Sequence, residues 1–124
     1  MAGYKFLIVD DSVFTRMYIK GFLEGKGHQV ISEAGNAEEA VLQYQLKKPD
    51  LTTMDLNMPG RSGLEAIKEI KKIDPSARFI IVSAVDQKLV HEEYAAWKAC
   101  EYIGKPPEWD NLNAAIDKLM KNPI

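Results

Sequence analysis

The chain has only one cysteine and no long hydrophobic run, and each shortage excludes a class of protein. A lone cysteine, Cys100, cannot form an internal disulfide bond, so a reducing compartment fits best and the thiol is expected to be a small buried hydrophobe. No apolar stretch approaches the ~20 residues that a bilayer-spanning helix needs. The start of the chain leads directly into a short strand-like run rather than a signal peptide. We therefore expect a cytoplasmic protein with no membrane partner.

The chain also lacks a strong excess of either charge. Sixteen Lys and Arg residues face 18 Asp and Glu residues, which leaves a formal net charge of −2 at pH 7. There is thus no electrostatic reason to expect a nucleic acid partner. The length of 124 residues, with 46% hydrophobic and 27% charged residues, is typical of one ordinary globular domain. We expect residues 1–124 to form a single domain that is a monomer.

What the chain does have is a regular alternation of short apolar runs and helical patterns. Five such strand–helix units predict an α/β fold, a doubly wound five-stranded parallel sheet flanked by five helices. The more polar run at 101–104 suits an edge strand. Strands are expected at residues 6–9, 28–32, 50–54, 79–82 and 101–104. Helices are expected over residues 13–23, from 37 to before Pro49, from 63 to before Asp74, over 87–97, and around 112–120.

The apolar runs that suit the inner strands, and the short run before Lys105, all end at residues able to handle a phosphoryl group. The carboxyl ends of parallel strands share one edge of the sheet, where open α/β folds bind their ligands. Carboxylates, a hydroxyl and an ammonium group should therefore meet at that edge. The residues at these strand ends are Asp10, Asp11, Asp55, Ser83, Ala84 and Lys105.

Three carboxylates in one small site indicate a cation. Like charges raise one another's pKa, and a hard divalent ion such as Mg²⁺, which binds carboxylate, water and phosphate oxygens, relieves that repulsion. Asp55, on the turn after the middle strand, is placed to attack phosphorus and form an aspartyl phosphate. Lys105 and the Ser83 hydroxyl would neutralise the transferring oxygens. The loop after Asp55 lets Asn57 present its main-chain carbonyl to the metal.

Five short motifs follow one another in a set order. They are Asp10-Asp11, Asp55-x-Asn57-Met58-Pro59-Gly60, Ser83-Ala84, Tyr102-Ile103 and Lys105-Pro106. This pattern resembles the receiver domain of two-component response regulators, and with nearly the whole chain covered it is most similar to the stand-alone, CheY-like receivers. Each motif is weak alone, but the ordered set is specific. The resemblance implies a flavodoxin-like fold with strand order 2-1-3-4-5.

The resemblance also implies a role for each matching residue. Asp55 would accept the phosphoryl group from a histidine kinase or phosphotransfer domain. Mg²⁺ would be bound by Asp11 directly, by Asp10 mainly through water, by Asp55, and by the main-chain carbonyl of Asn57. Ser83, Ala84 and Lys105 would bind the phosphoryl group, with a cis peptide bond between Lys105 and Pro106. Such a protein takes part in its own phosphorylation but is not a turnover enzyme.

Output would depend on protein–protein contacts. Ser83 would move toward the phosphoryl group and Tyr102 would swing inward behind it, which reshapes a surface that includes Tyr102 and Pro106 for a downstream target. The helix over 13–23 carries more apolar residues than one buried stripe requires. We therefore expect Phe14 or Met17 to be exposed and to dock the kinase or phosphotransfer domain. Chemotaxis, through a flagellar motor switch, is the commonest role of similar stand-alone proteins.

Other function classes fit less well or remain open. In a flavodoxin-like cofactor protein, Asp10-Asp11 would repel the phosphate of FMN. A phosphatase of the haloacid dehalogenase type needs a second acid two residues after the first, and position 57 is Asn. A receiver-like binding module that acts without phosphorylation stays open, as does a phosphorelay intermediate. Lys98 stands where similar proteins commonly end the fourth helix with Gly, so that end should differ locally.

Overall fold

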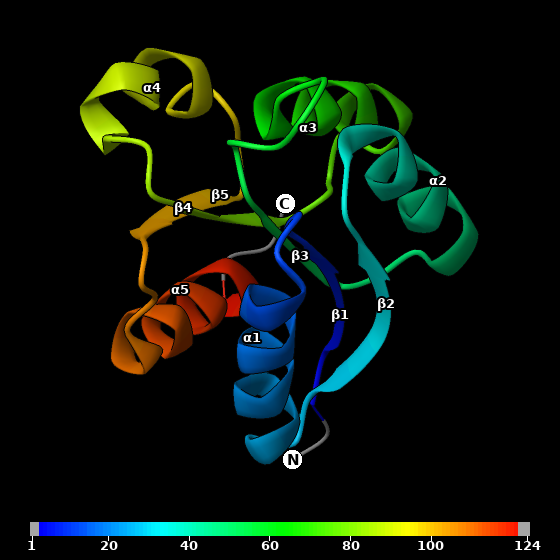
Figure 1. The fold of residues 1–124 in the computed structure, drawn as a ribbon, viewed down its shortest axis with the longest axis vertical. Helices are drawn as coiled ribbons and strands as arrows, with labels where there is room; N and C mark the ends of the chain where they lie inside the picture. Colours follow the sequence, from blue (N-terminus) through cyan, green and yellow to red (C-terminus); the bar gives the residue numbers. More distant parts are fainter. Residues whose placement is uncertain (1–2, 122–124) are drawn as a thin grey trace.

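The unbroken apolar runs of the sequence form the centre of a five-stranded sheet between two layers of helices (Figure 1). The computed structural model describes residues 3–121. The strand order is β2-β1-β3-β4-β5, with every neighbouring pair parallel, which confirms the predicted α/β class and order. The strands are β1 (Lys5–Val9), β2 (Gln29–Ala34), β3 (Leu51–Met54), β4 (Phe79–Ser83) and β5 (Cys100–Gly104). The helices are α1 (Val13–Gly25), α2 (Ala37–Lys47), α3 (Gly63–Ile73), α4 (Gln87–Tyr94) and α5 (Trp109–Lys121).

The inner strands are buried on both faces because helices cover each side. Alternate residues of a strand point to opposite faces, so Leu7 of β1 joins the core under α2, α3 and α4, while Ile8 joins the core under α1 and α5. All residues of β3 and β4 are buried. β5 is an edge strand, as predicted from its polar sequence. Cys100 is partly buried against the core under α2, α3 and α4, and burial raises the pKa of its thiol to about 12.

Several expected boundaries differ from those of the structure, and two of the differences have a clear physical cause. The second strand was expected at 28–32 but runs from Gln29 to Ala34, because its pairing with β1 continues as far as Val9 opposite Ala34. The fourth helix was expected to reach Trp97 but ends at Tyr94. Only two of its side chains are buried, so little packing holds a further turn. The left-handed residue after this helix is Ala99, with φ of 57°, rather than Lys98.

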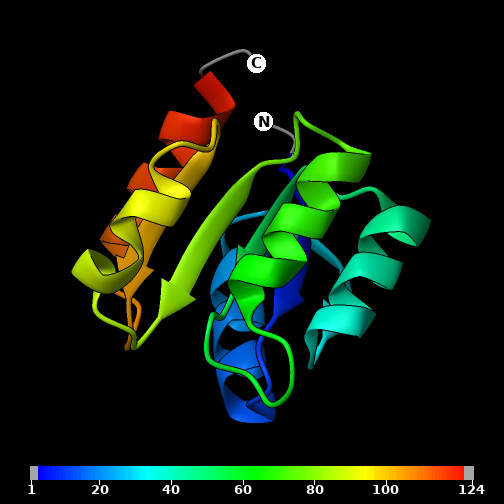
Figure 2. The same cartoon turned by 90° about the horizontal axis from the view of Figure 1, so that it is seen from above.

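The carboxyl ends of the strands form one edge of the molecule, with the loops to the following helices projecting from it (Figure 2). Gly63, the first residue of α3, lies directly against the β3 end. A β-carbon at this position would lie only 2.1 Å from the Asp55 carbonyl oxygen, which requires glycine here. Gly60 supplies a left-handed turn in the same loop, with φ of 81°. Both glycines therefore shape the backbone that carries Asp55.

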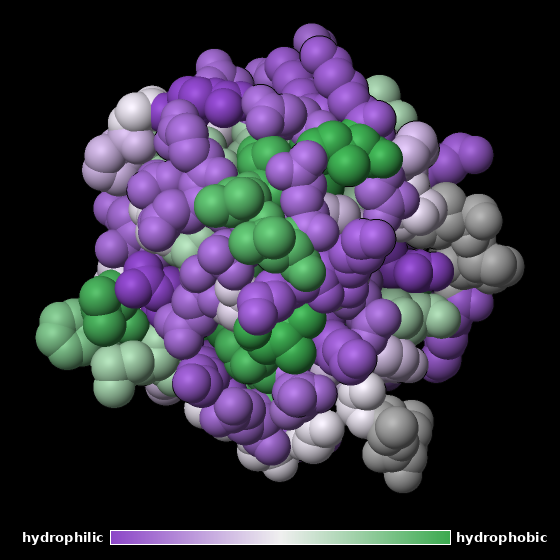
Figure 3. Space-filling view, turned by 90° about the vertical axis from the view of Figure 1, so that its right-hand side faces the viewer, coloured by the Kyte–Doolittle hydropathy of each residue, from purple (hydrophilic) through white to green (hydrophobic). Residues whose placement is uncertain are grey.

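Several large hydrophobic side chains remain on the surface. On α1, Phe14 is 83% exposed and Met17 is 62% exposed, which confirms that at least one of them is accessible. Leu42 and Leu46 of α2 are also exposed, and the face around α2 and β2 shows hydrophobic groups separated by hydrophilic ones (Figure 3). Among the described residues, no helix combines the length and hydrophobicity that a membrane crossing requires.

Candidate functional site

Three carboxylates meet at the carboxyl edge of the sheet. Asp10 follows β1 and Asp55 follows β3, and both are almost fully buried, while Asp11 is exposed. One oxygen from each of the three lies within 4.8 Å of the others. The backbone keeps these strand ends in register, since the Asp55 N–H donates to the Val9 carbonyl at 2.9 Å. The predicted convergence of acids far apart in the sequence is therefore present.

Lys105 joins two of these acids. Its Nζ lies 2.6 Å from Asp10 Oδ2 and 3.3 Å from Asp55 Oδ2, and its side chain is largely covered. Lys105 directly follows β5 and precedes a cis peptide bond to Pro106, as predicted. The ammonium group therefore sits between the two buried carboxylates while Asp11 faces solvent.

The surroundings shift the pKa values of both Asp55 and Lys105. Burial raises the pKa of the Asp55 carboxyl, and the Asp10 charge adds to the rise, although the Asn57 N–H and Lys105 act against it. Burial also opposes a charge on Lys105, but the Asp10 hydrogen bond and the charges of Asp55 and Asp10 outweigh it and raise the pKa of the ammonium group. Asp55 is thus a poorly solvated carboxylate that a further cation would stabilise.

The remaining predicted residues lie around this cluster. Ser83, the last residue of β4, is buried, and its Oγ accepts a hydrogen bond from the Val85 N–H at 3.2 Å. The Ser83 carbonyl accepts from the Lys105 N–H at 3.1 Å, so β4 and β5 stay paired up to the site. Ala84 is exposed beside it. The Asn57 N–H donates to Asp55 Oδ1 at 3.2 Å, which turns the loop back over the carboxylate.

The donor set fits Mg²⁺. Three carboxylates and one ammonium leave two uncompensated negative charges when all are ionised. The oxygens of Asp10, Asp11 and Asp55 are close enough to share one ion, and hard oxygen donors are what Mg²⁺ prefers. Asp11 makes no hydrogen bond or ion pair within residues 3–121 that would compete for its oxygens.

The sequence matches the family model of the response regulator receiver domain over residues 6–117. The chain belongs to this family. It is 42% identical to the chemotaxis protein CheY of Thermotoga maritima over 119 residues, which is 96% of this chain and 99% of that protein. It is also 42% identical to the CheY of Bacillus subtilis, with 95% and 98% covered. The chain is a two-component response regulator of the CheY type, a signalling protein rather than a turnover enzyme.

Solved receivers share the fold closely. A CheY of Borrelia burgdorferi, crystallised with CheX, BeF₃ and Mg²⁺, superimposes with a TM-score of 0.90 at 28% identity, covering 96% of this chain and 90% of that one. The response regulator TrrA of Thermotoga maritima, in complex with Mg²⁺ and BeF, has a TM-score of 0.82 at 33% identity, with 96% and 99% covered.

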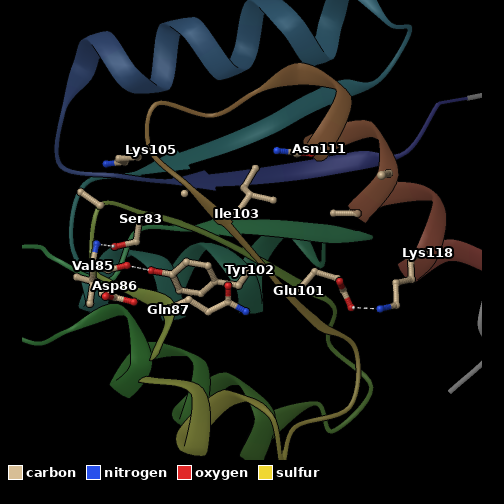
Figure 4. Close-up of a pocket in the computed structure, with 14 residues that line it drawn as sticks. Ser83, Val85, Asp86, Gln87, Glu101, Tyr102, Ile103, Lys105, Asn111 and Lys118 are labelled. Atoms are coloured by element: carbon tan, nitrogen blue, oxygen red, sulfur yellow. Dashed lines mark hydrogen bonds and ion pairs between the residues drawn. The ribbon is translucent and has the colours of Figure 1, made fainter. Parts of the chain in front are cut away.

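Tyr102 of this receiver faces the loop after Ser83 rather than open solvent. Its hydroxyl donates to the Val85 carbonyl (Figure 4). Its ring lies 5.5 Å from the ring of Tyr94 on α4. Figure 4 also shows Ser83 and Lys105 at the same end of this pocket, which extends to α5. The two residues predicted as a switch, Ser83 and Tyr102, thus contact the same short loop.

Some contacts of the site were not predicted from the sequence. Arg16, on the second turn of α1, donates to the Asp10 carbonyl and pairs with Glu33 of β2. Tyr94 is buried and receives a hydrogen bond from Gln87. For Arg16 the available signal was its place four residues after the Ser12 cap, which turns it back toward the strand end. Tyr94 gave no such signal, because a single aromatic in a weakly periodic helix predicts only packing.

Proposed function

We propose that this receiver accepts a phosphoryl group on Asp55 from a histidine kinase or phosphotransfer domain, and that Asp10, Asp11, Asp55 and the Asn57 main-chain carbonyl hold Mg²⁺. The observation that carries the proposal is the position of the Lys105 ammonium, within 3.3 Å of Asp55 and 2.6 Å of Asp10. An ordinary surface lysine is solvated and does not bridge two buried carboxylates as Lys105 does. A phosphoryl group on Asp55 would lie within its reach.

In the proposed reaction an Asp55 carboxylate oxygen attacks the phosphorus of a phosphohistidine. The new O–P bond forms as the P–N bond breaks, and the imidazole nitrogen leaves with the electron pair and takes a proton from solvent. Bound Mg²⁺ would supply positive charge to the phosphoryl oxygens. Lys105 would neutralise another oxygen, and the Ser83 hydroxyl and the backbone N–H of Ala84 would donate to a third. Because Asp55 is buried, little water solvates its carboxylate before the transfer.

The output we propose follows from the contacts of Tyr102. When Ser83 turns its hydroxyl toward a phosphoryl group, the Val85 N–H loses its acceptor and the loop that also binds Tyr102 must rearrange. That change would alter the surface around Tyr102 and Pro106 for a target protein. Chemotaxis is the pathway best supported, because the receivers at 42% identity are CheY proteins.

The setting of this function is also a proposal. We infer that residues 1–124 act as a single receiver domain and as a cytoplasmic monomer. The near-neutral charge and the match of 96% of this chain to a CheY protein support protein partners rather than nucleic acid or a membrane.

Docking of the phosphoryl donor is assigned to α1. Phe14, Met17 and Tyr18 form an exposed hydrophobic surface on the helix that begins beside the acids. Phe14→Ala should slow transfer from a kinase while leaving phosphorylation by a small phosphodonor unchanged. Leu42→Ala, which removes an exposed hydrophobic side chain from α2, is the matched control. Equal slowing in both variants would remove α1 from the docking surface.

The central test is phosphotransfer to wild type and to Asp55→Asn, with binding of beryllofluoride in Mg²⁺ as a second readout. Wild type should be labelled and should bind beryllofluoride, and Asp55→Asn should do neither. Asp74→Asn, an aspartate at the far end of α3, is the matched control and should behave as wild type. Failure of wild type to bind beryllofluoride would favour a binding module that acts without phosphorylation.

A further inference from the structure

A second group of contacts, outside the acids themselves, holds the segment that carries Asp10 and Asp11. The Arg16 guanidinium donates through Nη1 to the Asp10 main-chain carbonyl. Its Nε pairs with Glu33 Oε1 at 3.0 Å, and its side chain is only 17% exposed. One arginine therefore connects α1, the end of β1 and the edge strand β2.

The peptide that Arg16 binds lies between the two acids of the site. Its carbonyl is held by Arg16, and the N–H of the preceding peptide, that of Asp10, donates to the Ala34 carbonyl at 3.0 Å. The Asp10 carboxylate is held in turn by the Ser12 N–H at 2.9 Å. The carbonyl before Asp11 is held by Arg16 and the N–H after it by Asp10 Oδ1, so the backbone torsions of Asp11 are restricted, and with them the direction in which its side chain leaves the backbone. Within residues 3–121, Asp11 makes no hydrogen bond or ion pair of its own that would orient its carboxylate.

We propose that Arg16 is a positioning residue for the metal site, and that it holds Asp11 in the orientation that binds Mg²⁺ by anchoring the Asp10 carbonyl to Glu33. This inference rests on the proposed function. Outer-shell partners of metal ligands act in this way, and their loss typically weakens metal affinity by ~10–100-fold. The planar guanidinium holds its donors in a rigid fork, so Nη1 binds the carbonyl while Nε binds the carboxylate in one fixed geometry.

Electrostatics alone makes the opposite prediction, which gives the inference a sharp test. Arg16 is a positive charge next to a site for a cation, so its removal should strengthen Mg²⁺ binding if charge were all that mattered. If Arg16 acts through geometry, its removal should weaken Mg²⁺ binding despite the more favourable charge. The sign of the change therefore separates the two explanations.

The experiment is a titration with Mg²⁺ alone, followed through the amide NMR signals of the site residues. Arg16→Met should weaken Mg²⁺ binding about tenfold. Arg16→Lys keeps the charge but replaces the rigid fork of donors by a single flexible ammonium group, and should also weaken Mg²⁺ binding, by about threefold or more. Glu33→Gln should weaken it less than Arg16→Met, because the bond to the Asp10 carbonyl remains.

Lys20→Met is the matched control. Lys20 also pairs with Glu33, at 3.9 Å, but does not contact the Asp10 carbonyl. Its loss should leave Mg²⁺ affinity unchanged or slightly stronger. Urea unfolding of each variant without Mg²⁺ separates loss of fold from loss of binding, and Arg16→Lys carries the test if Arg16→Met does not fold.

Arg16→Met or Arg16→Lys with wild-type or stronger affinity for Mg²⁺ would overturn the inference. A wild-type protein that binds no Mg²⁺ would instead overturn the proposed function on which it rests. The two failures are distinct, because the first appears only in the variants and the second appears before any substitution is made.

Discussion

The described part of the chain buries polar side chains in two places, and the two differ in whether those groups have partners. At the carboxyl edge of the sheet, Asp10, Asp55 and Ser83 are buried and each contacts a lysine or a backbone N–H. In the middle of β3, Thr52 and Thr53 are at most 1% exposed, and within residues 3–121 their hydroxyls have no hydrogen-bond partner.

The buried carboxylates belong to the candidate site, whereas the buried threonines contribute to the packing of the strand. The site carboxylates are costly to bury, and Lys105 and backbone donors compensate them in an arrangement that also suits a phosphoryl group. The threonines are β-branched and fit the strand well, but their hydroxyls lose hydrogen bonds to water without replacement. The buried polar groups at the carboxyl ends of the strands are therefore compensated, whereas the two buried hydroxyls in the interior of β3 are not.

The largest effect should come from removing the Lys105 ammonium group that compensates the buried carboxylates. Lys105→Met leaves Asp10 and Asp55 facing each other without an ammonium between them. Phosphotransfer to Asp55 should fall by about 100-fold or more, and without Mg²⁺ the free energy of unfolding should fall by about 2 kcal/mol. Added Mg²⁺ should restore part of the stability. Urea unfolding with and without Mg²⁺ measures this.

The control for that variant is Lys68→Met, which breaks an exposed ion pair with Glu93 at 3.5 Å. An exposed pair contributes little, so the free energy of unfolding should change by less than about 0.5 kcal/mol. Equal losses in Lys105→Met and Lys68→Met would mean that Lys105 is an ordinary surface charge.

The backbone beneath the site should be nearly as sensitive. Gly63→Ala forces a β-carbon to within 2.1 Å of the Asp55 carbonyl oxygen, so the loop must shift, at a cost of about 1–3 kcal/mol, and beryllofluoride binding should weaken. Gly21→Ala on α1 has nothing within 4 Å of the new atom and should stabilise the helix by up to ~1 kcal/mol. Thermal unfolding measures the change in stability of both variants. A change of the same sign in both would contradict the close approach of Gly63 to the Asp55 carbonyl.

The pH dependence of stability should distinguish two aspartates. Because the folded pKa of Asp55 is raised, its ionisation disfavours folding, and this cost develops as pH rises above the ordinary value of 3.8 through the folded pKa. Asp55→Asn should therefore be more stable than wild type at neutral pH without Mg²⁺, with the gap closing near pH 4. Urea unfolding across this range measures the gap.

Asp74 should show the opposite sign. Hydrogen bonds from Tyr44 and Ser76 lower the pKa of its carboxyl, so it contributes stability above the ordinary value of 3.8 that is lost as pH falls through the lowered pKa. Asp74→Asn should be less stable than wild type at neutral pH. A pH-independent gap for Asp55→Asn, or the same sign for both, would contradict the raised pKa of Asp55.

The smallest effect should come from the interior of β3. Thr53→Val removes a buried hydroxyl without changing the shape of the side chain, and should raise the free energy of unfolding by about 1 kcal/mol. Ser83→Ala, at the compensated end, should lower it by a similar amount because the Val85 N–H loses its acceptor. Chemical denaturation of both variants tests this. Destabilisation by Thr53→Val would show that its hydroxyl is compensated after all.

Local features of the structure could be predicted well from the sequence. The starts of α2 and α3 at residues 37 and 63 agree with the expectation, because each follows a side-chain cap, Asn36 or Ser62, that depends only on residues within one turn. The ends of α4 and β2 could not be predicted, since they depend on pairing and packing with distant residues. The excess of apolar residues on α1 predicted exposure, but it did not say that Phe14 and Met17 would both be exposed.

By itself the sequence determined the order of strands and helices and the acids, hydroxyl and ammonium at the strand ends, because periodicity and chain order are local properties. Only the tertiary structure decided that Lys105 lies between Asp10 and Asp55, that Asp11 faces solvent, and that Arg16 holds the peptide between the two acids. Those contacts join strands and helices far apart in the chain, and their distances depend on how the sheet is ordered and packed.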